Sequence, residues 1–158
     1  MGERNNRKQR SEPQGGTAII NGLSHITLIV EDIHRTAHFL CSVLDAEEVY
    51  SSDGNSYSLS EEKFFLIGNV WLCVMQGKPL PQPSYNHIAF HVDETDLDAY
   101  HSRILSAGLE ILPPRPRVPG EGRSIYFYDY DNHLFELHTG SLAERLARYR
   151  QCNGGIQA

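Results

Sequence analysis

Leu23-Ser24-His25-Ile26 recurs 62 residues later in the chain as Tyr85-Asn86-His87-Ile88. The same offset aligns two later strand-like runs, so that Val74 of the first repeat falls on Glu136 of the second. Each repeat therefore carries a histidine early in its first strand, and the second repeat adds a carboxylate in its last. Two imidazoles and one carboxylate at equivalent positions of a repeat predict a divalent metal site with coordination positions left open for chemistry.

The predicted metal ligands are thus His25, His87 and Glu136. Val74, an aliphatic side chain at the position equivalent to Glu136, indicates that the protein supplies three ligands rather than four. A metal ion that prefers five or six ligands would then have room for water and substrate oxygens. Two histidines and one glutamate suit Mn(II), Fe(II), Co(II), Ni(II) or Zn(II), so the ligand set alone leaves the metal open.

Length and composition indicate one ordinary globular domain. The chain has 158 residues, of which 40% are hydrophobic and 22% charged, and its net charge is −6. This charge argues against nucleic acid or an anionic membrane surface as a partner. We expect no membrane-spanning segment and no secretory signal. Cys41 and Cys73 lie among apolar neighbours without metal-binding spacing, which predicts core thiols in a reducing cytoplasm.

Apolar periodicity predicts an α+β chain made of tandem βαβββ repeats that share one core. We expect a single domain at residues 21–150, with repeats at about 21–77 and 84–140 and a C-terminal helix at 142–150. Residues 1–20 are predicted to be a disordered arm, and residues 151–158 a tail.

The expected strands are bounded by turn residues and rich in β-branched or aromatic side chains. Asp32 should cap the first helix, and Gly108 should end the second, which begins near Leu97. The predicted strands lie at residues 25–30, 47–50, 56–59, 64–75 (as two strands joined at Gly68-Asn69), 87–92, 109–112, 124–130 and 133–138.

Four blocks of this sequence resemble the fosfomycin resistance proteins of the vicinal oxygen chelate superfamily, which also includes glyoxalases and extradiol dioxygenases. A fifth block resembles their epoxide hydrolase branch, known as FosX. The five blocks are Gly22-Leu23-Ser24-His25-Ile26-Thr27, Tyr85-Asn86-His87-Ile88-Ala89-Phe90, Gly122–Asp129, Asn132–Gly140 and Leu59-Ser60-Glu61-Glu62-Lys63-Phe64-Phe65-Leu66.

The resemblance implies the vicinal oxygen chelate fold, with paired repeats exchanged in a homodimer. His25 of one subunit would then meet His87 and Glu136 of the partner subunit. It implies a cytoplasmic, Mn(II)-dependent hydrolase that adds water to the epoxide of fosfomycin and so gives antibiotic resistance. Two alternatives stay open: a fosfomycin thiol transferase that uses glutathione or bacillithiol, and a non-catalytic drug-sequestering protein. The retained metal ligands speak against sequestration alone.

The resemblance also implies roles for particular residues. Glu62 would be the general base that activates water, although by itself a Glu61-Glu62 pair is most simply a charged turn. Fosfomycin is a small epoxide that bears a phosphonate, so its pocket needs fixed positive charge and hydroxyl donors. The expected substrate contacts are Thr27, Arg117, Ser124, Tyr126 and Arg145, and the sequence leaves open which of Arg115, Arg117 and Arg123 binds the phosphonate.

Overall fold

The computed structural model of the protein describes residues 20–55 and 57–154. The arm predicted for residues 1–20 therefore lies, except for Ile20, outside the described residues, as does the end of the predicted tail. The elements, in chain order, are β1 (His25–Val30), α1 (Ile33–Leu44), β2 (Glu47–Ser51), β3 (Glu62–Ile67), β4 (Val70–Gln76), β5 (His87–His91), α2 (Leu97–Ser106), β6 (Ser124–Tyr128), β7 (Leu134–His138) and α3 (Leu142–Gly154).

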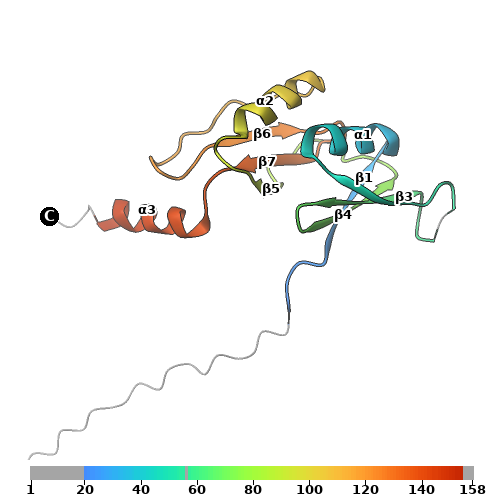
Figure 1. Cartoon of the computed structure of the whole chain (residues 1–158), viewed down its shortest axis with the longest axis horizontal. Helices are drawn as coiled ribbons and strands as arrows, with labels where there is room; N and C mark the ends of the chain where they lie inside the picture. Colours follow the sequence, from blue (N-terminus) through green and yellow to red (C-terminus); the bar gives the residue numbers. More distant parts are fainter. Residues whose placement is uncertain (1–19, 56, 155–158) are drawn as a thin grey trace, which may run out of the picture.

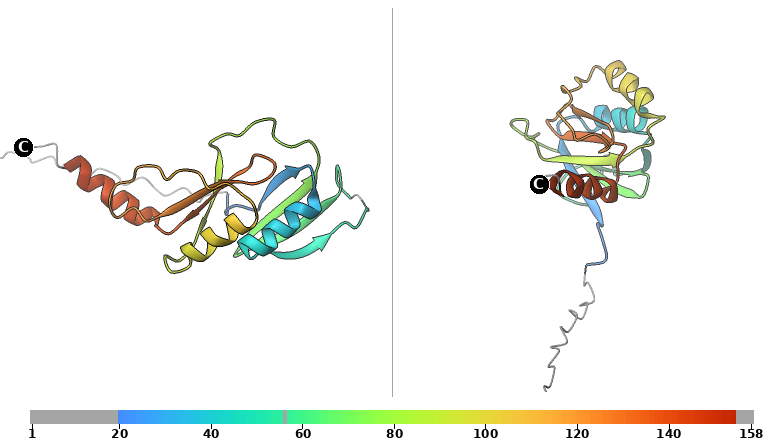
Figure 2. Two further views of the ribbon diagram at one scale, coloured as in Figure 1. Left: turned by 90° about the horizontal axis from the view of Figure 1, so that it is seen from above. Right: turned by 90° about the vertical axis from the view of Figure 1, so that its left-hand side faces the viewer.

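The strands form two sheets with matching topology. The first has the order β1-β4-β3-β2 and the second the order β5-β7-β6. In each sheet the first strand of the repeat pairs in parallel with the last, which in turn pairs antiparallel with the strand before it. Helices α1 and α2 lie side by side over the sheets, whereas α3 extends from the end of the second sheet (Figures 1 and 2). The predicted duplication is confirmed.

Helix α1 begins where the sequence predicts. The Asp32 carboxylate accepts hydrogen bonds from the backbone N–H groups of His34 and Arg35, at 3.0 and 2.9 Å, which satisfies two donors of the first turn. Asp45 ends the helix in the left-handed conformation, with φ of 53°. The apolar face of α1 is buried, but Cys41 is exposed, so the prediction of a core thiol is wrong there and correct for Cys73.

One hydrophobic core joins the two halves. The Phe39 ring of α1 packs edge-on against Phe127 of β6 and Phe135 of β7, with ring centroids 6.1 and 5.8 Å apart. All three side chains are almost fully buried. Because the helix of the first repeat covers the sheet of the second, neither half closes a core of its own.

The strand prediction is wrong at two places. Residues 57–59 form no strand, because Asp53 and Gly54, with φ of 48° and 82°, turn the chain away from β2. The strand expected at 109–112 is reduced to a single bridge between Ile111 and Phe127. Two prolines follow at once and cannot donate to a ladder. The second repeat is therefore βαββ among the described residues.

The other boundaries are closer to expectation. The long run at 64–75 is two strands, β3 and β4, as the turn at Gly68-Asn69 predicts, and Gly68 has φ of 55°. Gly108, with φ of 74°, follows the end of α2. The last helix continues to Gly154 instead of ending at Arg150.

The sheet registers correct the sequence alignment of the two repeats by one residue. His25 pairs with Trp71 and Thr27 with Cys73, whereas His87 pairs with Leu134 and Ala89 with Glu136. The counterpart of Glu136 is therefore Cys73, and not Val74 as a constant offset of 62 predicts. Val74 is fully buried in the core on the opposite face of β4. Cys73 is not acidic, so the interpretation that the first repeat lacks a carboxylate at this position still holds.

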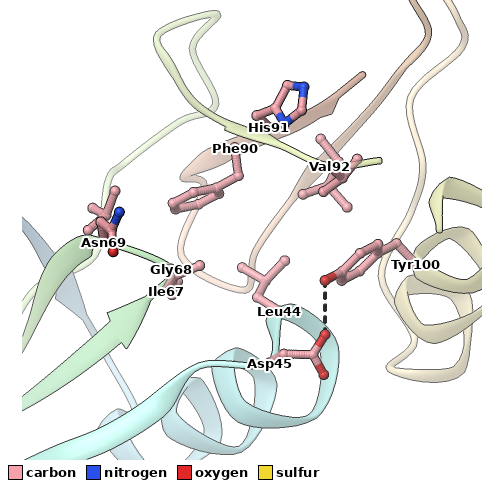
Figure 3. A pocket seen from close by; sticks show the side chains of 11 residues that line it. Leu44, Asp45, Ile67, Gly68, Asn69, Phe90, His91, Val92 and Tyr100 are labelled. Atoms are coloured by element: carbon pink, nitrogen blue, oxygen red, sulfur yellow. Dashed lines mark hydrogen bonds between the residues drawn. The ribbon is translucent and has the colours of Figure 1, made fainter. Parts of the chain in front are cut away.

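The seam between the halves contains an apolar cavity of about 500 Å³ (Figure 3). Leu44, Phe90 and Val92 line it, together with the β3–β4 turn. At its edge the Tyr100 hydroxyl donates a hydrogen bond of 2.9 Å to the Asp45 carboxylate, which ties α2 to the end of α1. This cavity lies apart from the predicted metal ligands.

Within the described part of the chain, no helix is both long and apolar enough to span a membrane.

Candidate metal centre and anion pocket

Two of the three predicted ligands meet on the second sheet. His87 of β5 and Glu136 of β7 project from the same sheet face, and His87 Nε2 lies 3.0 Å from Glu136 Oε2. The Nδ1 atom of His87 lies 2.8 Å from the backbone carbonyl oxygen of Tyr85. Because a carbonyl oxygen only accepts, Nδ1 carries the hydrogen and a neutral ring presents a lone pair at Nε2.

This geometry fits a metal ion. A lone pair on Nε2 and a carboxylate oxygen 3.0 Å away repel each other unless a cation lies between them. That cation is either a proton on the ring or a metal ion, and the carbonyl bond to Nδ1 is the arrangement typical of metal-binding histidines. The Glu136 side chain is only 5% exposed, which makes an uncompensated carboxylate costly at this position.

The other oxygen of Glu136 is already occupied. Glu136 Oε1 accepts hydrogen bonds from the Arg117 guanidinium at 2.9 Å and from the Ser124 hydroxyl at 2.5 Å. Burial acts to raise the pKa of Glu136, but hydrogen bonds from Ser124 and Tyr126 and the nearby imidazoles outweigh it, so the net pKa is lowered. The carboxylate is therefore ionised, with Oε2 left to face His87.

A small pocket of about 240 Å³ opens beside this pair. Its lining includes His87, Glu136, His138, Leu142 and Arg145. Arg145 comes from the first turn of α3. The positive charge of its guanidinium, next to the N-terminal end of a helix, suits a small anion.

The start of α3 is fixed by a reciprocal cap. The Ser141 hydroxyl accepts from the backbone N–H of Glu144 at 3.2 Å, and the Glu144 carboxylate accepts from the backbone N–H of Ser141 at 2.8 Å. Such a capping box holds the first helical turn, and with it Arg145, in a defined place at the pocket.

The three arginines among which the sequence cannot choose a phosphonate ligand occupy different places in the structure. Arg117 bonds Ser124, Glu136 and the Tyr126 hydroxyl. Arg115 lies 3.5 Å from the same hydroxyl, at the limit of a hydrogen bond. Arg123 instead pairs with Glu94 and Asp98 at the surface. Of the three, Arg117 is the one that the structure brings to the predicted ligands.

The third predicted ligand lies on the first sheet. His25 is exposed on β1, and its ring lies 4.5 Å from that of Trp71. Thr27, two residues further on the same face, pairs in register with Cys73. Within the described residues of one chain, no group of three His, Cys, Asp or Glu side chains converges as a metal site.

Glu62 shares this face of the first sheet. It begins β3 and is 8% exposed, and its backbone N–H donates a hydrogen bond of 3.1 Å to the Ser52 hydroxyl oxygen. Burial raises the pKa of the Cys73 thiol, and the charge of Glu62 raises it further, which places the carboxylate near Cys73. His25, Thr27 and Glu62 thus share one face of the first sheet, apart from the His87–Glu136 pair.

Sequence reasoning missed the aromatic rings around the ligands. Tyr85 packs against His87 and Tyr126, with centroids 5.2 and 6.1 Å apart, besides supplying the carbonyl oxygen for His87. Trp71 stands beside His25. Tyr85 precedes the predicted ligand His87 by two residues, and Trp71 pairs with the predicted ligand His25 across the two strands. Alternation of side chains along the strands could therefore have predicted that these rings share a face with the ligands.

Comparison with known proteins finds the predicted superfamily and fosfomycin resistance relatives along most of the chain. Residues 22–137 match the family model described as the glyoxalase/bleomycin resistance protein/dioxygenase superfamily. The fosfomycin resistance protein FosX of Mesorhizobium japonicum is 61% identical over 130 residues, which cover 82% of this chain and 94% of that protein. FosX of Listeria innocua is 59% identical over 133 residues, which cover 84% of this chain and all of that protein.

A solved structure extends the likeness to three dimensions. It is the crystal structure of a mutant FosX from Listeria monocytogenes in complex with Mn(II) and 1S,2S-dihydroxypropylphosphonic acid. Its sequence is 56% identical, the TM-score is 0.76, and the match covers 83% of this chain and 99% of that one.

Proposed function

Because the chain belongs to the FosX fosfomycin resistance proteins of the glyoxalase superfamily, we propose that it is an Mn(II)-dependent hydrolase that opens the epoxide of fosfomycin with water. The observation that carries this proposal is the His87–Glu136 pair beside a pocket lined by Arg145. It combines two metal ligands with positive charge suited to a phosphonate.

We propose that the complete site forms in a homodimer. The strands β1 and β5, which carry His25 and His87, are each terminal in their sheets. The face of the first sheet that carries His25 and Thr27 can therefore pack, in a dimer, against the face of the partner's second sheet that carries His87 and Glu136. His25 of one subunit would complete the ligand set with His87 and Glu136 of the partner subunit.

The metal, when bound, supplies Lewis-acid polarisation of the oxirane oxygen. The chain's own residues do the rest. Arg145 and Arg117, with the hydroxyl of Thr27, hold the phosphonate, whereas the hydroxyls of Ser124 and Tyr126, predicted as further contacts, donate to Glu136. Burial raises the pKa of Tyr126, so that its hydroxyl keeps its proton and can donate.

Glu62 takes one proton from a water molecule while the water oxygen forms a bond to an epoxide carbon. The bond between that carbon and the ring oxygen breaks, and the ring oxygen keeps the electron pair. The ring oxygen then takes up a proton from solvent and Glu62 releases its proton to solvent, so that the net reaction adds one water molecule and gives a vicinal diol. No thiol enters this reaction. Free cysteines at positions 41, 73 and 152 are in keeping with the proposed cytoplasmic location.

The deciding experiment is phosphorus NMR of fosfomycin incubated with Mn(II)-loaded protein, first without thiol and then with glutathione or bacillithiol. Formation of the diol in the absence of thiol supports the hydrolase. Product that forms only with thiol, as an adduct, would assign the chain to the thiol transferases instead. Unchanged fosfomycin that stays bound to the protein would indicate drug sequestration.

A further inference from the structure

His138 sits between the anion pocket and the metal pair without being a predicted ligand. It projects from β7 on the same face as Glu136 and pairs in register with Ser124 of β6. Its Nδ1 atom lies 2.8 Å from the Ser124 hydroxyl and 3.1 Å from the Arg123 carbonyl oxygen. Its Nε2 atom lies 3.3 Å from a guanidinium nitrogen of Arg145.

These partners fix the direction of each hydrogen bond. A carbonyl oxygen only accepts and a guanidinium only donates, so the neutral ring carries its hydrogen on Nδ1 and accepts from Arg145 at Nε2. Nδ1–H is then shared between the Arg123 carbonyl and the Ser124 hydroxyl oxygen. The hydrogen of that hydroxyl is left for Glu136 Oε1, 2.5 Å away. The donors therefore run in one direction, from Arg145 through His138 and Ser124 to Glu136.

Two glycines leave the space that the His138 ring needs. A Cβ atom at Gly140 would lie 2.8 Å from His138 Nε2 and closer still to the Glu121 carbonyl oxygen. One at Gly122, whose φ is +81°, would lie 2.6 Å from the Gly140 nitrogen. The two glycines thus allow the β6 and β7 ends to approach and let the imidazole reach both Ser124 and Arg145.

We propose that His138 is a positioning residue that couples anion binding at Arg145 to the orientation of the metal-binding carboxylate of Glu136. An anion that engages Arg145 alters its hydrogen bond to His138, and the change passes through Ser124 to Glu136 Oε1. By linkage, a bound metal alters the affinity of Arg145 for the anion to the same extent. The inference rests on the proposed function, because it assumes that Glu136 binds a metal.

The test measures binding rather than turnover, on the full-length protein. Mn(II) affinity is obtained from the electron paramagnetic resonance signal of the free ion, with and without saturating methylphosphonate, and methylphosphonate affinity by calorimetry on the Mn(II)-loaded protein. His138→Phe keeps the ring volume but removes both nitrogens. We expect it to weaken Mn(II) binding about 10-fold, as loss of an outer-shell partner does, and to abolish the change in Mn(II) affinity that methylphosphonate causes.

Two amide variants divide the roles of the two nitrogens. An Asn amide nitrogen lies near the position of Nδ1, and a Gln amide oxygen reaches that of Nε2. His138→Asn should therefore recover Mn(II) affinity but not the contribution of Arg145 to methylphosphonate binding, and His138→Gln should do the reverse. A merely space-filling role would not give this crossed pattern, and thermal unfolding curves check that each variant is folded.

Two results would overturn this inference and leave the proposed function intact, provided that the wild-type protein binds Mn(II). One is that the Asn and Gln substitutions have equal effects, and the other is that His138→Phe has no effect. A wild-type protein that binds no Mn(II) would overturn the proposed function, and the inference with it.

Discussion

Three strands of each sheet follow the same order, but the residues on the open faces of the two sheets differ. On the second sheet His87 and Glu136 touch, and Arg117 and Ser124 already hold the carboxylate. On the first sheet His25 stands beside an aromatic ring, and the position equivalent to Glu136 holds a neutral thiol, Cys73. The duplicated sheets thus have the same geometry but carry different residues: two of the proposed ligands lie on one face, and the third lies with the candidate base on the other.

The largest effect that separates the two sheets is expected when the carboxylate is removed from one sheet and the thiol from the other. Glu136→Ala should abolish Mn(II) retention and fosfomycin turnover together, because the site loses its negative charge and keeps the cation of Arg117. Cys73→Ala, at the equivalent position of the first sheet, should retain Mn(II). Metal analysis after gel filtration and phosphorus NMR measure the two effects. The assigned site is wrong if Glu136→Ala keeps stoichiometric metal and full turnover.

The first sheet should contribute chemistry more than metal affinity. Glu62→Gln keeps size and polarity but removes the base, and loss of a positioned general base costs about 10²- to 10⁴-fold in rate. We expect that loss in diol formation, with Mn(II) and fosfomycin binding preserved. The neighbouring Glu61→Gln is the matched control, since Glu61 precedes the strand. Unchanged diol formation by Glu62→Gln would remove this residue from the mechanism.

Mixing subunits tests whether the two faces meet across a dimer. His25→Ala and His87→Ala should each be inactive, yet exchanged subunits should regain about a quarter of wild-type activity. Half of randomly mixed C2 dimers contain both chains, and one of their two sites keeps all its ligands. Native mass spectrometry verifies exchange. No recovery after verified exchange would favour a site built within one chain.

The smallest expected effect lies at the seam between the halves. Burial acts to raise the pKa of Asp45, but hydrogen bonds from Arg103 and Tyr100 outweigh it, so the net pKa is lowered. The pair with Arg103, at 2.7 Å, is exposed on both sides and should stabilise the fold by at most about 1 kcal/mol.

Asp45→Asn should remove this contribution without strain, because Asn tolerates the left-handed conformation. A lowered folded-state pKa means that the contribution is present above the unfolded-state value, about 4, and is lost as the pH falls through the folded-state value. Urea unfolding at neutral and acidic pH measures it, with Arg103→Met and the double variant completing the cycle. Additive effects of the two single substitutions would show that the pair contributes nothing.

Local patterns in the sequence determined much of the fold. Alternation and turn residues predicted β1, the β3–β4 hairpin and the start of α1. These predictions succeeded because Asp32 caps a helix and Gly68 forms a turn through contacts with residues nearby in the sequence. The same patterns failed at 109–112, where the run is apolar enough for a strand but the prolines after it cannot complete a ladder. They also failed at 57–59, which follow the turn at Asp53 and Gly54 and form no strand.

The sequence by itself determined which residue types recur at equivalent positions, and this was enough to single out His25, His87 and Glu136. Only the tertiary structure decided which of them meet, because contact between strands depends on register and not on distance along the chain. Register replaced Val74 by Cys73 as the counterpart of Glu136, and the fold of the loop before β6 brought Arg117 rather than Arg123 to the carboxylate. The tertiary structure also set His138 between Ser124 and Arg145, a connection across two strands and a helix that no single stretch of sequence encodes.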